Sequence, residues 1–199
     1  MNEKKRYARP MTFLTPKETL GLLKAAREHS PRAWASILLA YKHGLRCSEV
    51  CGLLLEDVSL KTRQITLRRL KGSMCNVQNL ERVQGQPLLD ELKALKTWLD
   101  ERDDPSPFLF TSQKGGRLDR SAWFRLFQSV AEAAGLPPEK RHPHLAKHSL
   151  ASHLVAAGTN LAFIRQSLGH MSAASTARYT HVTDQQAGAE VKKALASTF

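Results

Sequence analysis

The sequence predicts a mostly helical α+β domain with a small antiparallel β-sheet, and three observations support this prediction. Apolar residues recur at helical spacing over most of the 199 residues, whereas residues 58–88 show the alternation typical of strands. Cap residues, glycines and prolines bracket the helical stretches. An apolar fraction of 42% is enough for the core of one ordinary domain.

The first two helices have clear start and stop signals. Thr15 is a good N-cap, Pro16 suits the first helical position, and Glu18 completes a capping box, which predicts a helix up to about residue 28. A second helix begins at Pro31 and ends at Gly44.

The middle of the chain predicts the sheet. The alternation over residues 64–68 suits a strand, Lys71 and Gly72 suit a turn, and residues 74–88 suit a second or third strand with a loose middle at residues 76–85. From Leu88 the leucines follow a helical stripe, which the acidic, proline-rich residues 103–107 stop.

The carboxy-terminal half returns to helices. Residues 108–110 predict a short apolar strand, followed by a turn at Gly115 and Gly116. Further helices are predicted from their caps and apolar stripes at residues 120–134, 144–157, 160–168 and 184–196.

Charge limits the kinds of partner. Thirty basic residues against eighteen acidic ones give a net charge of +12, which favours nucleic acid over a membrane, although ribosomal and RNA-binding proteins share such an excess. Residues 1–12 form a basic arm that either follows a DNA backbone or is a solvated tail, and residues 13–199 form the domain. Three cysteines and an amino terminus without an apolar run predict a cytoplasmic protein with no membrane span.

Four groups that can act on a phosphate lie within forty residues: His144, Lys147, His170 and Tyr179. A tyrosine is a poor nucleophile at neutral pH because its ordinary pKa is about 10, so it needs cations nearby. His144 and Lys147 are three residues apart, which places both on one face of a helix. His170 follows a glycine at a helix end, where a side chain can reach into a site.

A fifth candidate lies in the segment Gly44-Leu45-Arg46-Cys47-Ser48-Glu49. An arginine between a helix-ending glycine and the start of a new helix is held at a fixed place, and Glu49 can orient its guanidinium. Taken alone, the pattern is more typical of a surface ion pair between Arg46 and Glu49.

These motifs resemble the tyrosine recombinase (phage integrase) family. The first box is Gly44-x-Arg46-x-Ser48-Glu49, and the second is His144-x-x-Lys147-His148-Ser149; Leu168-Gly169-His170 and then Tyr179 follow. One departure is Lys147, which stands where the family has its second arginine. The resemblance implies the recombinase catalytic domain alone, with the layout of short DNA invertases or of a piece cut from a longer protein.

The resemblance also implies the roles of the residues. Tyr179 would attack a DNA phosphodiester to give a 3′-phosphotyrosine, and Lys71 would be the general acid for the leaving 5′ oxygen. The remaining assignments are phosphate binding by Arg46, His144, Lys147 and His170, support by Glu49 and His148, and DNA contacts by Lys140, Arg141 and Arg178. Lys71 and the pair Lys140 and Arg141 could instead be solvated surface residues.

Double-stranded DNA is the implied partner, with self-assembly from dimer to tetramer on it, and the nucleoid is the implied location. We expect no cofactor and no metal, because the bond energy is kept in the covalent intermediate and the carboxylate of a zinc helix is missing beside His144, His148 and His153. Two alternatives stay open. The chain could be a catalytically weak DNA-binding accessory protein, as Lys147 would explain, or a type IB topoisomerase with the same chemistry.

Overall fold

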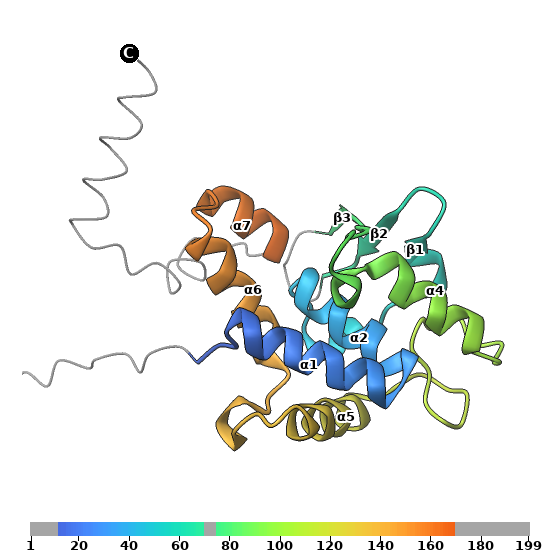
Figure 1. Ribbon diagram of the computed structural model, residues 1–199. Helices are drawn as coiled ribbons and strands as arrows, with labels where there is room; N and C mark the ends of the chain where they lie inside the picture. The colour runs from blue at the N-terminus through green and yellow to red at the C-terminus, as the bar shows by residue number, and fades with distance from the viewer. Residues whose placement is uncertain (1–11, 70–74, 170–199) are drawn as a thin grey trace, which may run out of the picture.

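The computed structural model describes residues 12–69 and 75–169 (Figure 1). These residues confirm the predicted class, with seven α-helices, three 3₁₀ turns and one three-stranded antiparallel sheet. The predicted arm, apart from Thr12, and the predicted helix 184–196 lie outside the described residues. None of the helices in the described part of the chain is long and apolar enough to cross a membrane.

Helices α1 (Pro16–His29) and α2 (Pro31–Lys42) begin where the sequence predicts. The capping box at α1 is formed, with the Thr15 hydroxyl accepting from the Glu18 N–H and the Glu18 carboxylate accepting from the Thr15 N–H. Helix α2 is buried along most of its length because α1, α4, α5 and α6 all pack against it. In Figure 1, α4 lies on one side of α2 and α6 on the other, so α2 is the central helix of the domain.

The sheet consists of β1 (Val58–Ser59), β2 (Gln64–Leu67) and β3 (Asn76–Asn79), in the order β1-β2-β3. It is preceded by the short helix α3 (Cys47–Val50) and by the 3₁₀ turn η1 (Leu55–Asp57). Only the central strand is buried on one face, through Ile65 and Leu67. The sheet is therefore a small element that packs on the helical core through one face of its central strand.

Two strand predictions are wrong. The strand expected up to Leu88 forms only at Asn76–Asn79, within the stretch 76–85 that is expected to be loose. It ends there because Glu81 turns out of the sheet and exchanges two hydrogen bonds with Glu91 at the start of α4 (Glu91–Glu101). The expected strand 108–110 forms only one isolated bridge, Leu54 to Phe108, and a second bridge, Thr111 to Arg117, lies just beyond it, because no neighbouring strand continues the pairing among the described residues. The 3₁₀ turn η2 (Pro87–Leu89) fills the place of the predicted strand end.

Helix α5 (Arg120–Ala133) is capped by Asp119 as predicted, and the 3₁₀ turn η3 (Pro138–Lys140) connects it to α6 (His144–Ala156). Asn160 caps α7 (Leu161–Leu168). Helices α6 and α7 enclose a small apolar cluster of their own, made of Leu150, Ala151, Ile164 and Leu168. The predicted helices 120–134, 144–157 and 160–168 are thereby confirmed to within a residue or two.

The start of the domain is fastened to α6 by hydrogen bonds that span more than 130 residues of sequence. The Leu14 N–H donates to Ser149 Oγ (2.8 Å), and the Leu14 carbonyl accepts from His153 Nε2 (2.8 Å). The other ring nitrogen, His153 Nδ1, is hydrogen-bonded to the Tyr41 hydroxyl (2.8 Å). These contacts explain both Ser149 and His153 without a metal or a catalytic role.

Candidate active site

Arg46 stands between α2 and α3 at a sharp bend of the chain. Gly44 makes this bend with a φ of +57°, and a Cβ there would lie 2.5 Å from the Leu168 side chain, so only glycine fits. Two residues later, Arg46 is the N-cap of α3. Its guanidinium Nη1 donates to Glu49 Oε1 (2.9 Å), and its backbone N–H donates to Glu49 Oε2 (2.8 Å).

Glu49 is therefore the residue that orients Arg46, as the motif predicts. The carboxylate side chain is 2% exposed, whereas the Arg46 side chain is 38% exposed. Burial by itself would raise the pKa of Glu49, but the Arg46 N–H and the charges of Arg69, Lys147 and Arg46 outweigh it and hold this pKa below its ordinary value. Glu49 stays ionised, so the guanidinium keeps a fixed direction with part of its surface open to a ligand.

Lys147 lies on α6, on the buried side of this pair. The residue is 6% exposed, and its Nζ donates to the Leu168 carbonyl at the end of α7 (2.9 Å). Burial lowers the pKa of Lys147 to about 7, with help from the charges of Arg46 and Arg69 and against the attraction of Glu49. Near neutral pH this amine is therefore protonated in only part of the molecules, whereas an arginine in the same place would stay charged.

His144, the first residue of α6, is exposed on a cleft of about 510 Å³. Its ring stacks on that of His142, with centroids 5.4 Å apart. Burial first, and then the charges of His142, Arg46, Arg120 and Lys147, lower the pKa of His144. The residues that line the cleft come from α3, α5 and the start of α6: Cys47, Arg120, Ser121, Phe124, Arg125, His142, Pro143 and His144.

Arg69 is a buried hub of this site that the sequence analysis did not single out. Its side chain is fully buried; Nη1 donates to Glu49 Oε2 (3.3 Å) and to the Gly44 carbonyl (3.3 Å), while Nη2 donates to the carbonyls of His43 (2.8 Å) and Ser167 (2.8 Å). Arg69 thus ties the Arg46 loop to the end of α7. The alternation of the strand held a signal, because Ile65, Leu67 and Arg69 fall on the same inward face.

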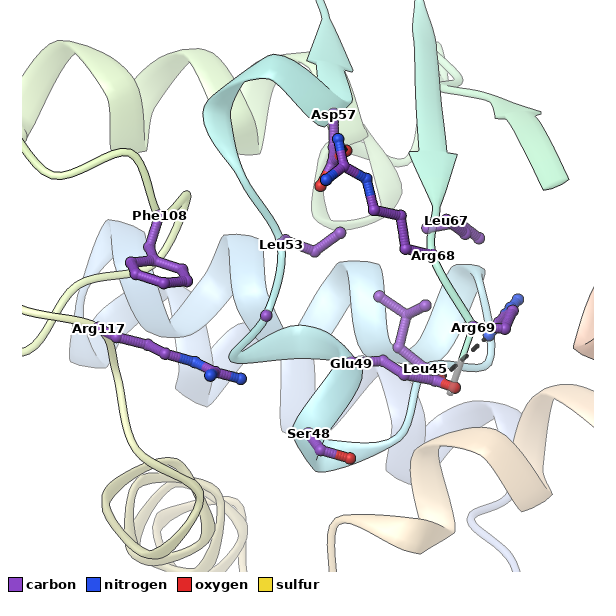
Figure 2. A pocket seen from close by; sticks show the side chains of 11 residues that line it. Leu45, Ser48, Glu49, Leu53, Asp57, Leu67, Arg68, Arg69, Phe108 and Arg117 are labelled. Carbon is purple, nitrogen blue, oxygen red and sulfur yellow. Dashed lines mark hydrogen bonds and ion pairs between the residues drawn. The ribbon is translucent and has the colours of Figure 1, made fainter. Parts of the chain in front are cut away.

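A pocket of about 230 Å³ lies behind Glu49, between α3, the end of β2 and the loop at 108–117 (Figure 2). Its walls include Leu45, Leu53 and Phe108, and the Arg117 guanidinium lies over the Phe108 ring at 5.3 Å. Neither Arg46, His144 nor Lys147 lines it. Among Arg46, Glu49, His144 and Lys147, only Glu49 lines this pocket and only His144 lines the cleft.

The predicted DNA contacts Lys140 and Arg141 have carboxylate partners within the fold. Lys140 Nζ bonds both oxygens of Glu18 on α1 (2.7 and 2.8 Å), and Arg141 Nη1 bonds Glu132 on α5 (2.5 Å). These ion pairs fasten the segment before α6 to both helices. Contacts of the two residues with DNA remain a prediction.

Several predicted site residues are not part of this geometry. Lys71, His170, Arg178 and Tyr179 lie outside the described residues, and His148 lies half-buried on α6. Within the described ranges, no three histidine, cysteine, aspartate or glutamate side chains are placed to hold a metal. What the fold brings together is Arg46, Glu49, His144 and Lys147, from segments about a hundred residues apart.

Comparisons with known proteins point to one family. Residues 12–186 match the Phage integrase family. The Type 1 fimbriae regulatory protein FimB of Escherichia coli (strain K12) is 35% identical over 175 residues, covering 84% of this chain and 83% of FimB. The tyrosine recombinase XerA of Pyrococcus furiosus is 32% identical, covering 91% of this chain but 61% of XerA.

Solved structures agree. The crystal structure of XerA recombinase superposes with a TM-score of 0.75 at 28% identity, covering 92% of this chain and 65% of that one. The catalytic domain of bacteriophage HP1 integrase superposes with a TM-score of 0.63 over 94% of its length, and at 21% identity it shows the fold alone. The predicted fold class is confirmed by both.

Proposed function

The chain belongs to the phage integrase family, the tyrosine recombinases, which are enzymes that break and rejoin DNA, and we propose that it does so at specific sites through a covalent 3′-phosphotyrosine at Tyr179. The observation that carries the proposal is the clamp of Arg46 by Glu49, with Lys147 and His144 gathered around it. Arg46 at the start of α3 and His144 and Lys147 on α6 are close enough to act on one another's charge, and such a set of basic side chains can bind one phosphate.

The proposed reaction is an in-line displacement at phosphorus. The Tyr179 oxygen forms a bond to the phosphorus, the bond to the 5′ oxygen breaks, and Lys71 supplies the proton that makes this oxygen a hydroxyl. Arg46, Lys147, His144 and His170 stabilise the charge spread over the phosphoryl oxygens. Attack by the 5′ hydroxyl of a partner strand on the phosphotyrosine reverses the step and exchanges the strands.

The energetics of this exchange need no nucleotide. One phosphate ester is made for each one broken, so the bond energy stays in the protein–DNA intermediate. The main task of the protein is therefore to hold its cations in place before the reaction begins. The buried carboxylate of Glu49, ionised and bonded to Arg46 twice, serves that task.

DNA is the proposed substrate, in the nucleoid of the cytoplasm, and the net charge of +12 supports this. We also propose assembly of two to four copies on DNA. Three apolar side chains support an assembly surface, because Phe163 and Leu161 on α7 and Val77 on β3 are 71%, 43% and 58% exposed. Cross-linking with and without DNA tests it, and a chain that stays monomeric on its site contradicts it.

A second candidate function rests on Lys147. Its ammonium spends one hydrogen bond on the Leu168 carbonyl and has a pKa of about 7, so it grips a phosphate less firmly than a forked guanidinium. A chain with this weakness could occupy recombination sites without cutting them. It would then be an accessory DNA-binding protein.

One experiment separates the two functions. A duplex site is first selected from a randomised library by repeated binding to the protein, and it is then rebuilt with a nick that traps the cleaved strand. Denaturing gels of the wild type, Tyr179→Phe and Lys147→Arg are compared. An adduct lost only in Tyr179→Phe supports the recombinase, whereas an adduct seen only in Lys147→Arg supports the accessory protein. No adduct from either lysine or arginine form on a bound site would overturn the recombinase proposal.

A further inference from the structure

Two carbonyls at the carboxy-terminal end of α7 accept hydrogen bonds from side chains of other elements. A helix leaves its last carbonyls without a partner inside the helix, so their partners must come from elsewhere. The Leu168 carbonyl accepts from Lys147 Nζ of α6 (2.9 Å). The Ser167 carbonyl accepts from Arg69 Nη2, just after β2 (2.8 Å), and from Gln78 Nε2 of β3 (2.9 Å). The ammonium that the proposed phosphate site uses is therefore bonded to a helix end that other residues hold in place.

Strand β3 bonds this helix end twice. Besides the Gln78 bond, Asn76 Nδ2 donates to the Gln166 carbonyl (3.0 Å), one residue earlier on α7. Residues two apart in a strand point to the same side, so the amides of Asn76 and Gln78 both face α7, which lies beside β3 (Figure 1). The contact between strand and helix is thus made by two amide side chains in register.

Gln78 is itself held by two buried side chains. Its Oε1 lies 2.7 Å from His43 Nδ1, and His43 Nε2 lies 2.6 Å from Glu91 Oε1 at the start of α4. Because Gln78 Nε2 donates to a carbonyl, Oε1 faces the ring and accepts from His43 Nδ1. The side chains of His43 and Glu91 are 3% and 1% exposed, and the other Glu91 oxygen accepts the Glu81 N–H (3.1 Å). A row of hydrogen bonds therefore runs from α4 through His43 and β3 to α7.

The end of this row lies one residue from the acceptor of Lys147. Consecutive residues of a helix rise by only about 1.5 Å, so a shift of the Ser167 carbonyl also moves the Leu168 carbonyl. Among the described residues, the Leu168 carbonyl is the one hydrogen-bond acceptor of Lys147 Nζ. A lysine has a flexible stem and no planar fork, so the place of its ammonium depends on the acceptor that it bonds.

We propose that Gln78 is a positioning residue that sets the place of the Lys147 ammonium. It acts through the last turn of α7, where its bond to Ser167 fixes the neighbouring Leu168 carbonyl. The use of Lys147 at a phosphate rests on the proposed function, whereas its placement by Gln78 does not. The two are therefore tested separately, first without DNA and then with it.

The first test observes the Lys147 amine by NMR in the full chain labelled with ¹⁵N at the lysine side-chain nitrogens. At pH 6 this amine, with its pKa of about 7, is mostly protonated, and loss of its signal in Lys147→Arg identifies it. Gln78→Met keeps the length of the side chain but removes both of its hydrogen bonds. We expect the Lys147 ammonium protons to exchange with water about three- to tenfold faster in this variant, the range that one lost hydrogen bond gives. Unchanged exchange would overturn the proposal, as would a wild-type signal already broadened by fast exchange.

Two further variants separate placement from folding. Asn79→Met changes an exposed neighbour on β3 whose side chain bonds no other described residue, so the exchange at Lys147 should stay as in the wild type. An increase equal to that of Gln78→Met would overturn the proposal. Gln78→Glu keeps an acceptor for His43 but has no donor for the Ser167 carbonyl, so it should loosen Lys147 as well, and wild-type exchange there would overturn the route through α7. Urea titrations show which variants are folded, and either substitution of Gln78 carries the test alone.

The second test asks whether this placement matters to a bound phosphate. Affinity for the selected DNA site at pH 6 is measured for the wild type, Gln78→Met, Lys147→Met and the double variant. We expect Gln78→Met to weaken binding about threefold or more by itself, but by less than about twofold once Lys147 is replaced. Losses that simply multiply would overturn the coupling of Gln78 to Lys147. The covalent-capture experiment decides the recombinase proposal by itself, and a missing adduct there leaves both of these tests in force.

Discussion

Two arginines bond the Glu49 carboxylate, Arg46 from the exposed side and Arg69 from the buried side, and the two regions differ in what this bond does. On the exposed side, the Arg46 guanidinium bonds one carboxylate oxygen and the Arg46 side chain stays 38% exposed. On the inner side, Arg69 reaches the other oxygen with no exposed side chain, and its Nη1 and Nη2 donate to Glu49 and to three backbone carbonyls, while its buried Nε has no hydrogen-bond partner among the described residues. Two arginines on one carboxylate therefore have two functions, presentation of charge and support of the fold.

The difference shows how a phosphate site can be preorganised. An exposed guanidinium without a partner would change between rotamers. The Arg46 guanidinium is instead bonded to a buried carboxylate, which Arg69 holds in place from the inner side, so its direction is fixed. Arg69 also lies against α7, so the same residue sets the distance between the Arg46 loop and the end of the helix that leads to His170. Arg69 on the inner side thereby keeps Glu49, and through it the exposed Arg46 guanidinium, in a fixed position.

The largest expected effect comes from the inner region. Arg69→Met leaves Glu49 buried with one fewer cation and frees three carbonyls, so the free energy of unfolding should fall by about 3–5 kcal/mol in urea titrations. Arg68→Met is the matched control, because Arg68 lies at the same strand end (Figure 2) but its side chain is 56% exposed, and it pairs with the exposed Glu56 and the buried Asp57. The free energy of unfolding should fall less than in Arg69→Met, because the Arg68 guanidinium is open to water and Asp57 also accepts the Leu54 N–H. Equal midpoints for the two variants would break the comparison.

The outer region should show the reverse pattern. Arg46→Lys replaces a planar fork with a point charge, so the rate of covalent capture should fall by about 10²–10³-fold, while the free energy of unfolding changes by less than about 1 kcal/mol. Single-turnover cleavage and urea titration of one preparation give both quantities. A variant that loses stability as strongly as Arg69→Met would show that Arg46 is structural.

Contact between Arg69 and the end of α7 gives a smaller effect. Gly169 has a φ of +65°, and a Cβ there would lie 3.1 Å from Arg69 Nε. Gly169→Ala should therefore cost about 2 kcal/mol of unfolding free energy, from backbone strain and this contact together. Gly158→Ala, at a φ of +74° with no described atom within 4 Å of the Cβ, has the strain alone. Equal losses in the two variants would mean that Arg69 yields without cost.

The smallest expected effect is the pH dependence set by Lys147. A bound phosphate favours the charged amine, so DNA binding should take up a proton whenever the pH is above the free-protein pKa of about 7. Affinity should then fall by up to tenfold per pH unit above pH 7, until the raised pKa of the complex is reached. Lys147→Arg should remove this part of the slope, and identical slopes in both proteins would show that Lys147 does not change its charge on binding.

Local sequence patterns were sufficient to predict the helices of the described residues and the order of the motifs. The helix ends were predicted correctly from local signals: the capping box at Thr15, the glycines after the helices and the cap at Asp119. Such signals are local because the unpaired N–H and C=O groups at a helix end are bonded by residues close in sequence. The pairing of Arg46 with Glu49 was equally local, since three residues separate them. Motif order was enough to identify the family, which the comparisons confirm.

Tertiary structure alone decided the rest. Strand β3 ends at Asn79 because Glu81 bonds Glu91 instead of continuing the sheet. The predicted strand 108–110 has no continuous partner strand among the described residues, and a local pattern does not show whether a partner is present. The role of Arg69, the burial of Lys147 and its lowered pKa come from segments about a hundred residues apart in sequence. Burial and charge at such places are sums over distant neighbours, and a sequence read locally contains the neighbours but not their distances.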